Sequence, residues 1–270
     1  MPTFTPPSPA HAAFLARALP LLRDDARLVG VAAAGSLADG TADAFSDLDL
    51  VVAVEPAAAA AVARERMQIA AGLGPLVAAF TGEHVGEPRL LVCLYAGEGG
   101  HPPLHVDLKF VALPDAAARV DEPVVLWERD GRLTRALGAG EARYPAPDLR
   151  WIEDRFWVWV HYAALKLGRG ELFEAVDVLA FLRGQVLGPL ALLEAGARPA
   201  GVRRLETAAP ARAAEVAATV CAYDRAACAA SLRAAAALYR ALRQSLAPSG
   251  FAPNEAAERA AMAYLGAVAP

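Results

Sequence analysis

The segment Gly35–Val52 reads GSLADGTADAFSDLDLVV, and it leads from an apolar stretch through a Gly-Ser turn into a second apolar stretch. The second stretch predicts a strand, on which residues two apart point to the same face. Asp47 and Asp49 are therefore expected side by side. Two such carboxylates repel each other unless a cation lies between them. Hard oxygen ligands paired in this way favour Mg²⁺, which takes substrate phosphates as further ligands. The segment predicts a site for a metal ion and a nucleotide.

The turn itself suits an anion. Gly35 lets the backbone turn tightly and approach a ligand closely. Ser36 is a good N-cap for a predicted short helix, and the free amides behind it suit a phosphate. A capped turn with no ligand is the alternative interpretation of these two residues. The loop is not a Walker A loop, because Gly40 is followed by Thr41 and no lysine stands at the phosphate-binding position.

A third carboxylate comes from a later stretch, HVDLKFV, which alternates as a strand does. His105, Asp107 and Lys109 share one face of that strand, and a solvated outer face is the alternative to a functional one. If the face lines the site, Asp107 binds a second metal ion or accepts a proton, and Lys109 reaches a phosphate. His101 and His105 have a metal-like spacing, but two prolines between them prevent a helical pair, so no zinc site is expected there.

The periodicity of apolar residues changes along the chain. Strands and helices are mixed in the first half, whereas the second half is helical, and Pro145-Ala146-Pro147 marks the boundary. The sequence thus predicts a domain over 1–145 that contains a sheet and a helical bundle over 146–270. The expected strands are 28–34, 48–54, 76–80, 89–95 and 104–113. The expected helices are 10–23, 57–71, 152–167, 172–193, 211–246 with one break, and 254–265.

Composition excludes several classes of protein. The 270 residues carry a formal charge of −4 without a concentrated basic stretch, so no nucleic-acid partner is expected. The N-terminus lacks the features of a signal peptide, and no window reaches about 18 uninterrupted apolar residues, so no membrane span is expected. Three cysteines without CxxC spacing indicate reduced thiols, and we expect a cytoplasmic protein.

Lysine is nearly absent. The chain has 26 basic residues, of which only Lys109 and Lys166 are lysines. A compact ammonium acts on phosphate as a point charge that a planar guanidinium reproduces poorly. The two lysines are therefore candidate phosphate ligands, and survival by chance is the alternative.

The order of these motifs carries a resemblance. A Gly-Ser pair is followed after ten residues by Asp-x-Asp and later by an aspartate on a predicted strand, all within Gly35–Asp107. This order resembles the motifs of the DNA polymerase β-type nucleotidyltransferase superfamily. Its small-molecule branch, which includes the aminoglycoside and lincosamide nucleotidyltransferases, is most similar. The resemblance implies an α+β fold, in which an N-terminal nucleotidyltransferase domain with a mixed sheet precedes a helical substrate-binding domain.

The resemblance also implies an activity. A nucleoside monophosphate, expected to be AMP, would pass from an NTP such as ATP to a hydroxyl of a small molecule, with antibiotics among the candidate acceptors, and pyrophosphate would be released. Two Mg²⁺ ions are expected at the catalytic carboxylates. The expected partners are the nucleotide and the acceptor, and the chain is expected to be a monomer or a homodimer. The implied metal and catalytic residues are Asp47, Asp49 and Asp107, and the implied nucleotide-binding residues are Gly35, Ser36, Lys109 and Lys166.

One feature departs from the branch. Its first helix after the catalytic domain can supply a phosphate-binding lysine, here Lys166, and a carboxylate one turn earlier that acts as the base. Tyr162 stands at that earlier position, with His161 beside it. The general base stays open among Asp107, His161, Glu83 and Glu87, and Asp107 is favoured.

Two other functions remain open. The acceptor could be a protein or an RNA end, as in toxin–antitoxin adenylyltransferases, although the large helical half and the lack of a basic face argue against it. The chain could also be an inactive nucleotide-binding protein. The intact set of Asp47, Asp49 and Asp107 argues against that alternative.

Overall fold

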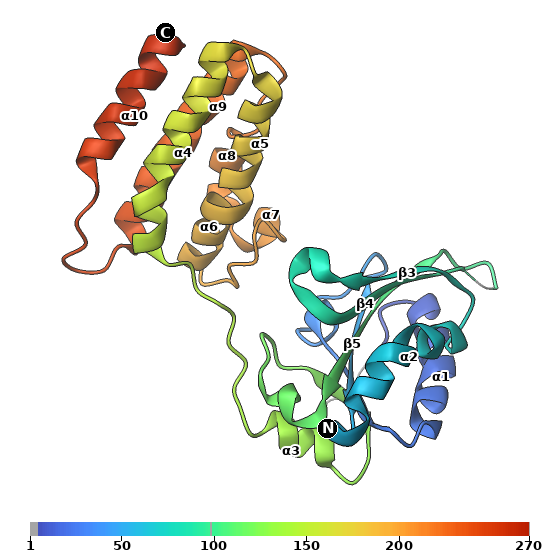
Figure 1. Ribbon diagram of the computed structural model, residues 1–270. Coiled ribbons are helices and arrows are strands. Elements are labelled where there is room, and N and C mark those ends of the chain that lie inside the picture. The colour runs from blue at the N-terminus through green and yellow to red at the C-terminus, as the bar shows by residue number, and fades with distance from the viewer. Residues whose placement is uncertain (1–4, 98, 270) are drawn as a thin grey trace. The chain divides into compact units, whose positions relative to one another are not determined.

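The computed structural model describes residues 5–97 and 99–269. Contacts between residues divide the chain after Tyr144 into unit 1, which holds a six-stranded sheet, and unit 2, which is helical (Figure 1). The sheet is mixed, because one of its strand pairs is parallel and the others are antiparallel. These features confirm the predicted α+β class with a mixed sheet followed by helices.

The strands of unit 1 lie in the order β3-β4-β5-β2-β1-β6. Their bounds are β1 Leu28–Ala33, β2 Leu48–Val54, β3 Leu76–Gly82, β4 Glu87–Tyr95, β5 Leu104–Ala112 and β6 Val124–Glu128. The parallel pair is β2 with β5, at the centre of the sheet, and its register sets Asp49 directly beside Asp107. Residues paired in register project from the same face, so the pairing brings together two carboxylates that are 58 positions apart in the sequence.

Two helices cover one face of the sheet. They are α1 (Pro9–Asp24), which Ser8 caps through its side chain, and α2 (Ala59–Gly72), and Figure 1 shows them on the same side of the strands. Alternate residues of the central strands, among them Leu50 and Leu108, are buried in the core beneath them. The residues between these positions must then project from the opposite face.

The opposite face is covered in part. Helix α3 (Arg132–Leu137) packs there through Leu133 against a small core that includes Ala53 and Val111, near the carboxyl ends of β2 and β5. At the other end of the same strands, Asp49 and Asp107 remain partly exposed. The face thus divides into a buried apolar end and an open acidic end.

Unit 2 consists of helices packed around an aromatic centre. Phe156 and Tyr239 stack with ring centroids 3.9 Å apart, and Trp157 packs edge-on against both rings. Helix α10 runs along α4 (Figure 1). The helices are α4 Leu149–Arg169, α5 Leu172–Leu182, α6 Gly188–Glu194, α7 Leu205–Ala208, α8 Pro210–Ala217, α9 Arg225–Leu246 and α10 Glu255–Val268.

One helical segment of unit 2 is long and apolar. Helices α5 and α6 are joined by a π-helical turn, Arg183–Leu187, into the continuous segment Leu172–Glu194. By length and composition this segment is the one among the described residues that could cross a membrane, and half of its most apolar window is buried within the structure. The core helix of a soluble protein has the same properties, so the segment is weak evidence for a membrane span.

Two elements of unit 1 were not predicted. No strand or helix was expected between 114 and 151, yet this part of the chain contains β6 and α3. Strand β6 is only five residues long and all of its residues are partly exposed, so it has no apolar alternation to reveal it. It exists because β1 offers it an edge, on which Val31 pairs with Trp127.

Candidate functional site

Three side chains converge at the open acidic end of the sheet. Asp47 lies just before β2, and His105 and Asp107 project from β5. Each offers a ligand atom, and these atoms lie within 4.8 Å of one another. The Nε2 atom of His105 donates a hydrogen bond to Oδ1 of Asp107 at 3.0 Å. The predicted pairing of Asp107 with the Asp-x-Asp segment is therefore present in the geometry of unit 1.

Asp49 lies beside this cluster and against the Gly-Ser turn. Its backbone oxygen accepts a hydrogen bond from the amide of Ala34 at 2.9 Å, which fixes the turn to β2. Gly35 adopts a left-handed φ of 58°, and a Cβ atom at this position would clash with Oδ2 of Asp49. Glycine is thus needed here for conformation and for space. The sequence predicted that the backbone at Gly35 approaches a ligand closely, and in the structure it closely approaches the side chain of Asp49.

The turn differs from the prediction in its hydrogen bonds. Ser36 was expected to cap a helix, but it lies inside the short 3₁₀ turn Gly35–Leu37, where Ala34 is the N-cap and no side chain caps the turn. The amide of Gly35 donates to Oδ2 of Asp121 at 2.9 Å. The left-handed Gly35 starts the turn two residues earlier than the sequence indicated, so the predicted capping role of Ser36 is wrong.

Lys109 shares the open face with Asp107 and is held by a neighbouring strand. Its Nζ atom lies 2.8 Å from a carboxylate oxygen of Glu87 on β4. Hydrogen bonding from Arg89, together with Lys109, lowers the pKa of Glu87 to about 2. A carboxylate with so low a pKa is a weak proton acceptor. Lys109 would have to exchange Glu87 for a phosphate in order to bind a nucleotide.

Lys166 belongs to unit 2 and is held by two carboxylates there. Its Nζ lies 2.9 Å from Glu171 and 2.7 Å from Glu174, and these contacts raise its pKa. The hydroxyl of Tyr162 donates to Glu174 at 2.8 Å. A carboxylate therefore stands beside Lys166 and Tyr162, although it comes from α5 and not from α4. Sequence spacing along one helix could not reveal it.

The other candidate bases lie in different surroundings. Glu83 accepts a hydrogen bond from the hydroxyl of Thr81, which lowers its pKa. The ring of His161 packs against that of Tyr264, with centroids 4.7 Å apart, in unit 2. Asp107 lies among the ligand atoms of the acidic end, so it has the position of a base or of a metal ligand.

The donor set at the acidic end fits a divalent cation. Two carboxylates and an imidazole supply oxygen and nitrogen atoms close enough to share one ion, and Asp49 adds a further carboxylate next to Asp107. His105 was not predicted as a member of this set. Its two-residue spacing from Asp107 on a strand was the available signal.

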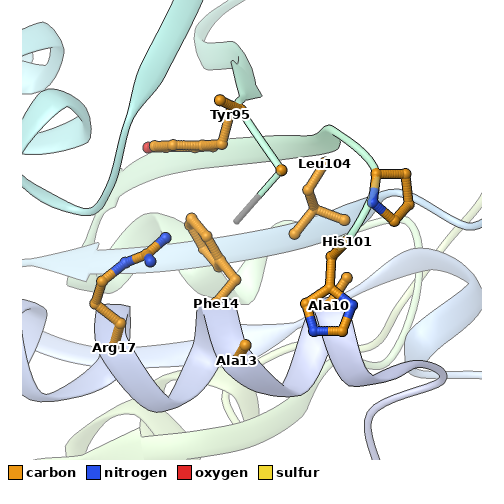
Figure 2. Close-up of a pocket in the computed structure, with 10 residues that line it drawn as sticks. Ala10, Ala13, Phe14, Arg17, Tyr95, His101 and Leu104 are labelled. Atoms are coloured by element: carbon orange, nitrogen blue, oxygen red, sulfur yellow. The ribbon is translucent and has the colours of Figure 1, made fainter. Parts of the chain in front are cut away.

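A pocket lies on the other side of the sheet. Figure 2 shows Phe14 and Arg17 of α1 facing Tyr95 and the loop that carries His101. The rings of Phe14 and Tyr95 lie 4.8 Å apart, and the Tyr95 hydroxyl donates to the carbonyl of Ala70. Phe14, Tyr95 and Ala70 belong to the core beneath α1, so the pocket is separate from the acidic end. His101 accordingly lines this pocket, whereas His105 lies at the acidic end.

Comparisons with known proteins give distant similarity to solved structures. No family model matches the sequence, and no curated protein matches it. The chain is similar to the crystal structure of an aminoglycoside 6-adenyltransferase from Bacillus subtilis, with 15% sequence identity, a TM-score of 0.40, and coverage of 97% of this chain and 98% of that one.

Proposed function

We propose that this chain is a metal-dependent nucleotidyltransferase that moves a nucleoside monophosphate, AMP first among the candidates, from an NTP to a hydroxyl of a small molecule. One observation carries the proposal. The Asp-x-Asp segment and the later strand aspartate, which the sequence separates, meet through the parallel register of β2 and β5, and the Gly-Ser turn lies against Asp49.

The carboxylates explain why a metal is needed. Asp47, Asp49 and Asp107 concentrate negative charge where a triphosphate would have to bind, and a cation must offset that repulsion. Divalent ions at these residues would activate the acceptor hydroxyl and neutralise charge on the departing pyrophosphate.

The roles of the other residues follow from their positions. Gly35 lets the turn approach Asp49 and so keeps that carboxylate in place. Lys109 binds a phosphate after exchange from Glu87, and Asp107 accepts the proton of the acceptor hydroxyl unless it is fully engaged as a ligand. In unit 2, Lys166 forms a polar cluster with Glu174 and Tyr162, and we assign this cluster to binding of the acceptor or the nucleotide. Little further chemistry is required of the protein, because positioning and charge compensation supply the rate.

The test is pyrophosphate release. The protein is incubated with Mg²⁺, each NTP and a panel of hydroxylated small molecules that includes antibiotics, and modified acceptors are identified by mass. Asp49→Asn should reduce turnover by about 100-fold or more, since it removes one of the charges that hold the cation. Asp24→Asn is the matched control, because Asp24 is an exposed residue at the end of α1.

The outcomes separate the alternatives. Full activity in Asp49→Asn would contradict the proposal. Label transferred from ATP to macromolecules in a lysate, and not to small molecules, would favour a protein or RNA acceptor. Tight binding of NTP without turnover on any acceptor would favour an inactive nucleotide-binding protein.

A further inference from the structure

His105 lies at the acidic end of the sheet and has no role in the metal site as proposed above, which uses the three carboxylates alone. It lies on β5 two residues before Asp107, on the same open face, and its side chain is 51% exposed whereas that of Asp107 is 19% exposed. It is paired across the sheet with Leu94, whose side chain cannot hydrogen-bond to it. The fold therefore directs the imidazole toward the acidic end with Asp107 as its polar neighbour.

The imidazole is within reach of the ligand atoms. Its Nε2 lies 3.0 Å from Oδ1 of Asp107, and its ligand atom falls within the 4.8 Å cluster that includes Asp47. Donor atoms that share one metal ion lie about 3 Å apart or slightly more, because each bond to the ion is about 2 Å long. A cation bound to both Nε2 of His105 and Oδ1 of Asp107 would replace the hydrogen bond between these two atoms.

A nitrogen donor changes which ions a site prefers. Mg²⁺ takes oxygen ligands almost exclusively, whereas first-row transition ions accept imidazole together with carboxylates. Two carboxylates with one imidazole thus form a mixed donor set that favours Mn²⁺ and the later first-row ions over Mg²⁺.

We infer that His105 is a direct nitrogen ligand of the metal site formed with Asp47 and Asp107, and that it makes this site select Mn²⁺-type ions over Mg²⁺. The inference rests on the metal site of the proposed function and adds to it a ligand and an ion preference. His105 would be a metal ligand and not merely a residue that orients Asp107.

The experiment uses the whole chain with Mn²⁺ alone and with Mn²⁺ plus inorganic triphosphate, neither of which contains nitrogen. Bound Mn²⁺ is counted by electron paramagnetic resonance, and pulsed measurements detect coupling of the ion to ¹⁴N. The variants are His105→Gln and, as a matched control, His84→Gln, since His84 is also an exposed histidine of unit 1 but lies in the turn after β3. Thermal unfolding verifies that both variants fold.

The expected result is ¹⁴N coupling of the imidazole type in the unchanged protein and in His84→Gln, and its loss in His105→Gln. Mn²⁺ affinity should fall by about tenfold in His105→Gln, and competition by Mg²⁺ should become correspondingly more effective. Mn²⁺ bound without ¹⁴N coupling in the unchanged protein, or coupling that persists in His105→Gln, would overturn the inference and leave the proposed function standing. No Mn²⁺ binding under either condition would overturn both.

Discussion

At the scale of single residues, Gly35 links the backbone turn to the position of a carboxylate. Both Gly35 and Gly40 have left-handed φ values, 58° and 72°, but only at Gly35 would a Cβ meet a neighbour, namely Asp49. An alanine in this region costs about 1–2 kcal/mol of strain. The two positions thus form a matched pair that separates backbone strain from displacement of Asp49.

We expect Gly35→Ala to lose both stability and metal binding, whereas Gly40→Ala loses only stability by about the same 1–2 kcal/mol. Urea unfolding measures the first quantity, and Mn²⁺ titration measures the second. Equal metal affinity in the two variants would show that the contact between Gly35 and Asp49 has no bearing on the site.

Single residues also mark the limit of what could be predicted from the sequence. Asp47, Asp49 and Asp107 were identified by their period-2 spacing and order. The ion pairs of Lys109 with Glu87 and of Lys166 with Glu174 were not, because these partners come from neighbouring strands or helices. Whether the seven predicted site residues act as proposed stays a prediction, since only their geometry is known.

At the scale of elements, a buried carboxylate joins three helices of unit 2. The Glu153 side chain on α4 is fully buried, and it accepts hydrogen bonds from Tyr239 at 2.6 Å, Arg243 at 3.0 Å and the amide of Asn254 at 2.8 Å. Burial alone would raise the pKa of Glu153, but these hydrogen bonds and the charge of Arg243 outweigh it and hold the pKa below 4.5.

We expect Glu153→Ala to destabilise the protein by about 3 kcal/mol or more, because Arg243 and the Tyr239 hydroxyl lose their buried partner. Asp154→Asn on the same helix is the control. Its pair with Arg150 is exposed and 3.8 Å long, so the change should stay within about 0.5 kcal/mol. Denaturant unfolding followed through α-helical circular dichroism measures both, and equal effects would contradict a structural role for Glu153.

The acid dependence of stability has a definite sign. Because the pKa of Glu153 is lower in the folded chain than in the unfolded chain, its contribution is complete above about pH 4.5 and is lost as the pH falls through the folded value. Unfolding of Glu153→Ala should therefore be less sensitive to pH below 4.5 than unfolding of the unchanged protein. If the free energy of unfolding changed equally with pH in both proteins, groups other than Glu153 would cause the acid sensitivity.

Elements were predicted well where apolar periodicity is strong and poorly where it is not. The two helices of the 211–246 stretch and the break between them appear as expected, and the longer helix, α9, has buried residues that recur from Cys228 to Leu242. Strand β6 depends on pairing with β1, and the order of strands in the sheet depends on contacts between distant segments. Neither could be obtained from local patterns.

At the scale of the whole molecule, contacts between residues divide the chain into two structural units, 1–144 and 145–270. The segment between α3 and α4 contains exposed residues without regular structure, among them Arg143 and Pro145. We expect trypsin at low concentration to cleave first after Arg143, because exposed irregular segments are the preferred sites of cleavage. Mass spectrometry of early fragments would identify the cut, and first cleavage within a strand of unit 1 or within a helix of unit 2 would contradict two compact units.

We propose that Asp47, Asp49 and Asp107 bind the metal that holds the triphosphate of an NTP. A crystal structure with Mn²⁺ and a non-hydrolysable ATP analogue, analysed by the anomalous scattering of Mn²⁺, tests this claim without knowledge of the acceptor. We predict an anomalous peak bonded to these carboxylates with phosphate oxygens as further ligands. A triphosphate bound elsewhere, or bound with no metal at these carboxylates, would contradict the proposed metal site.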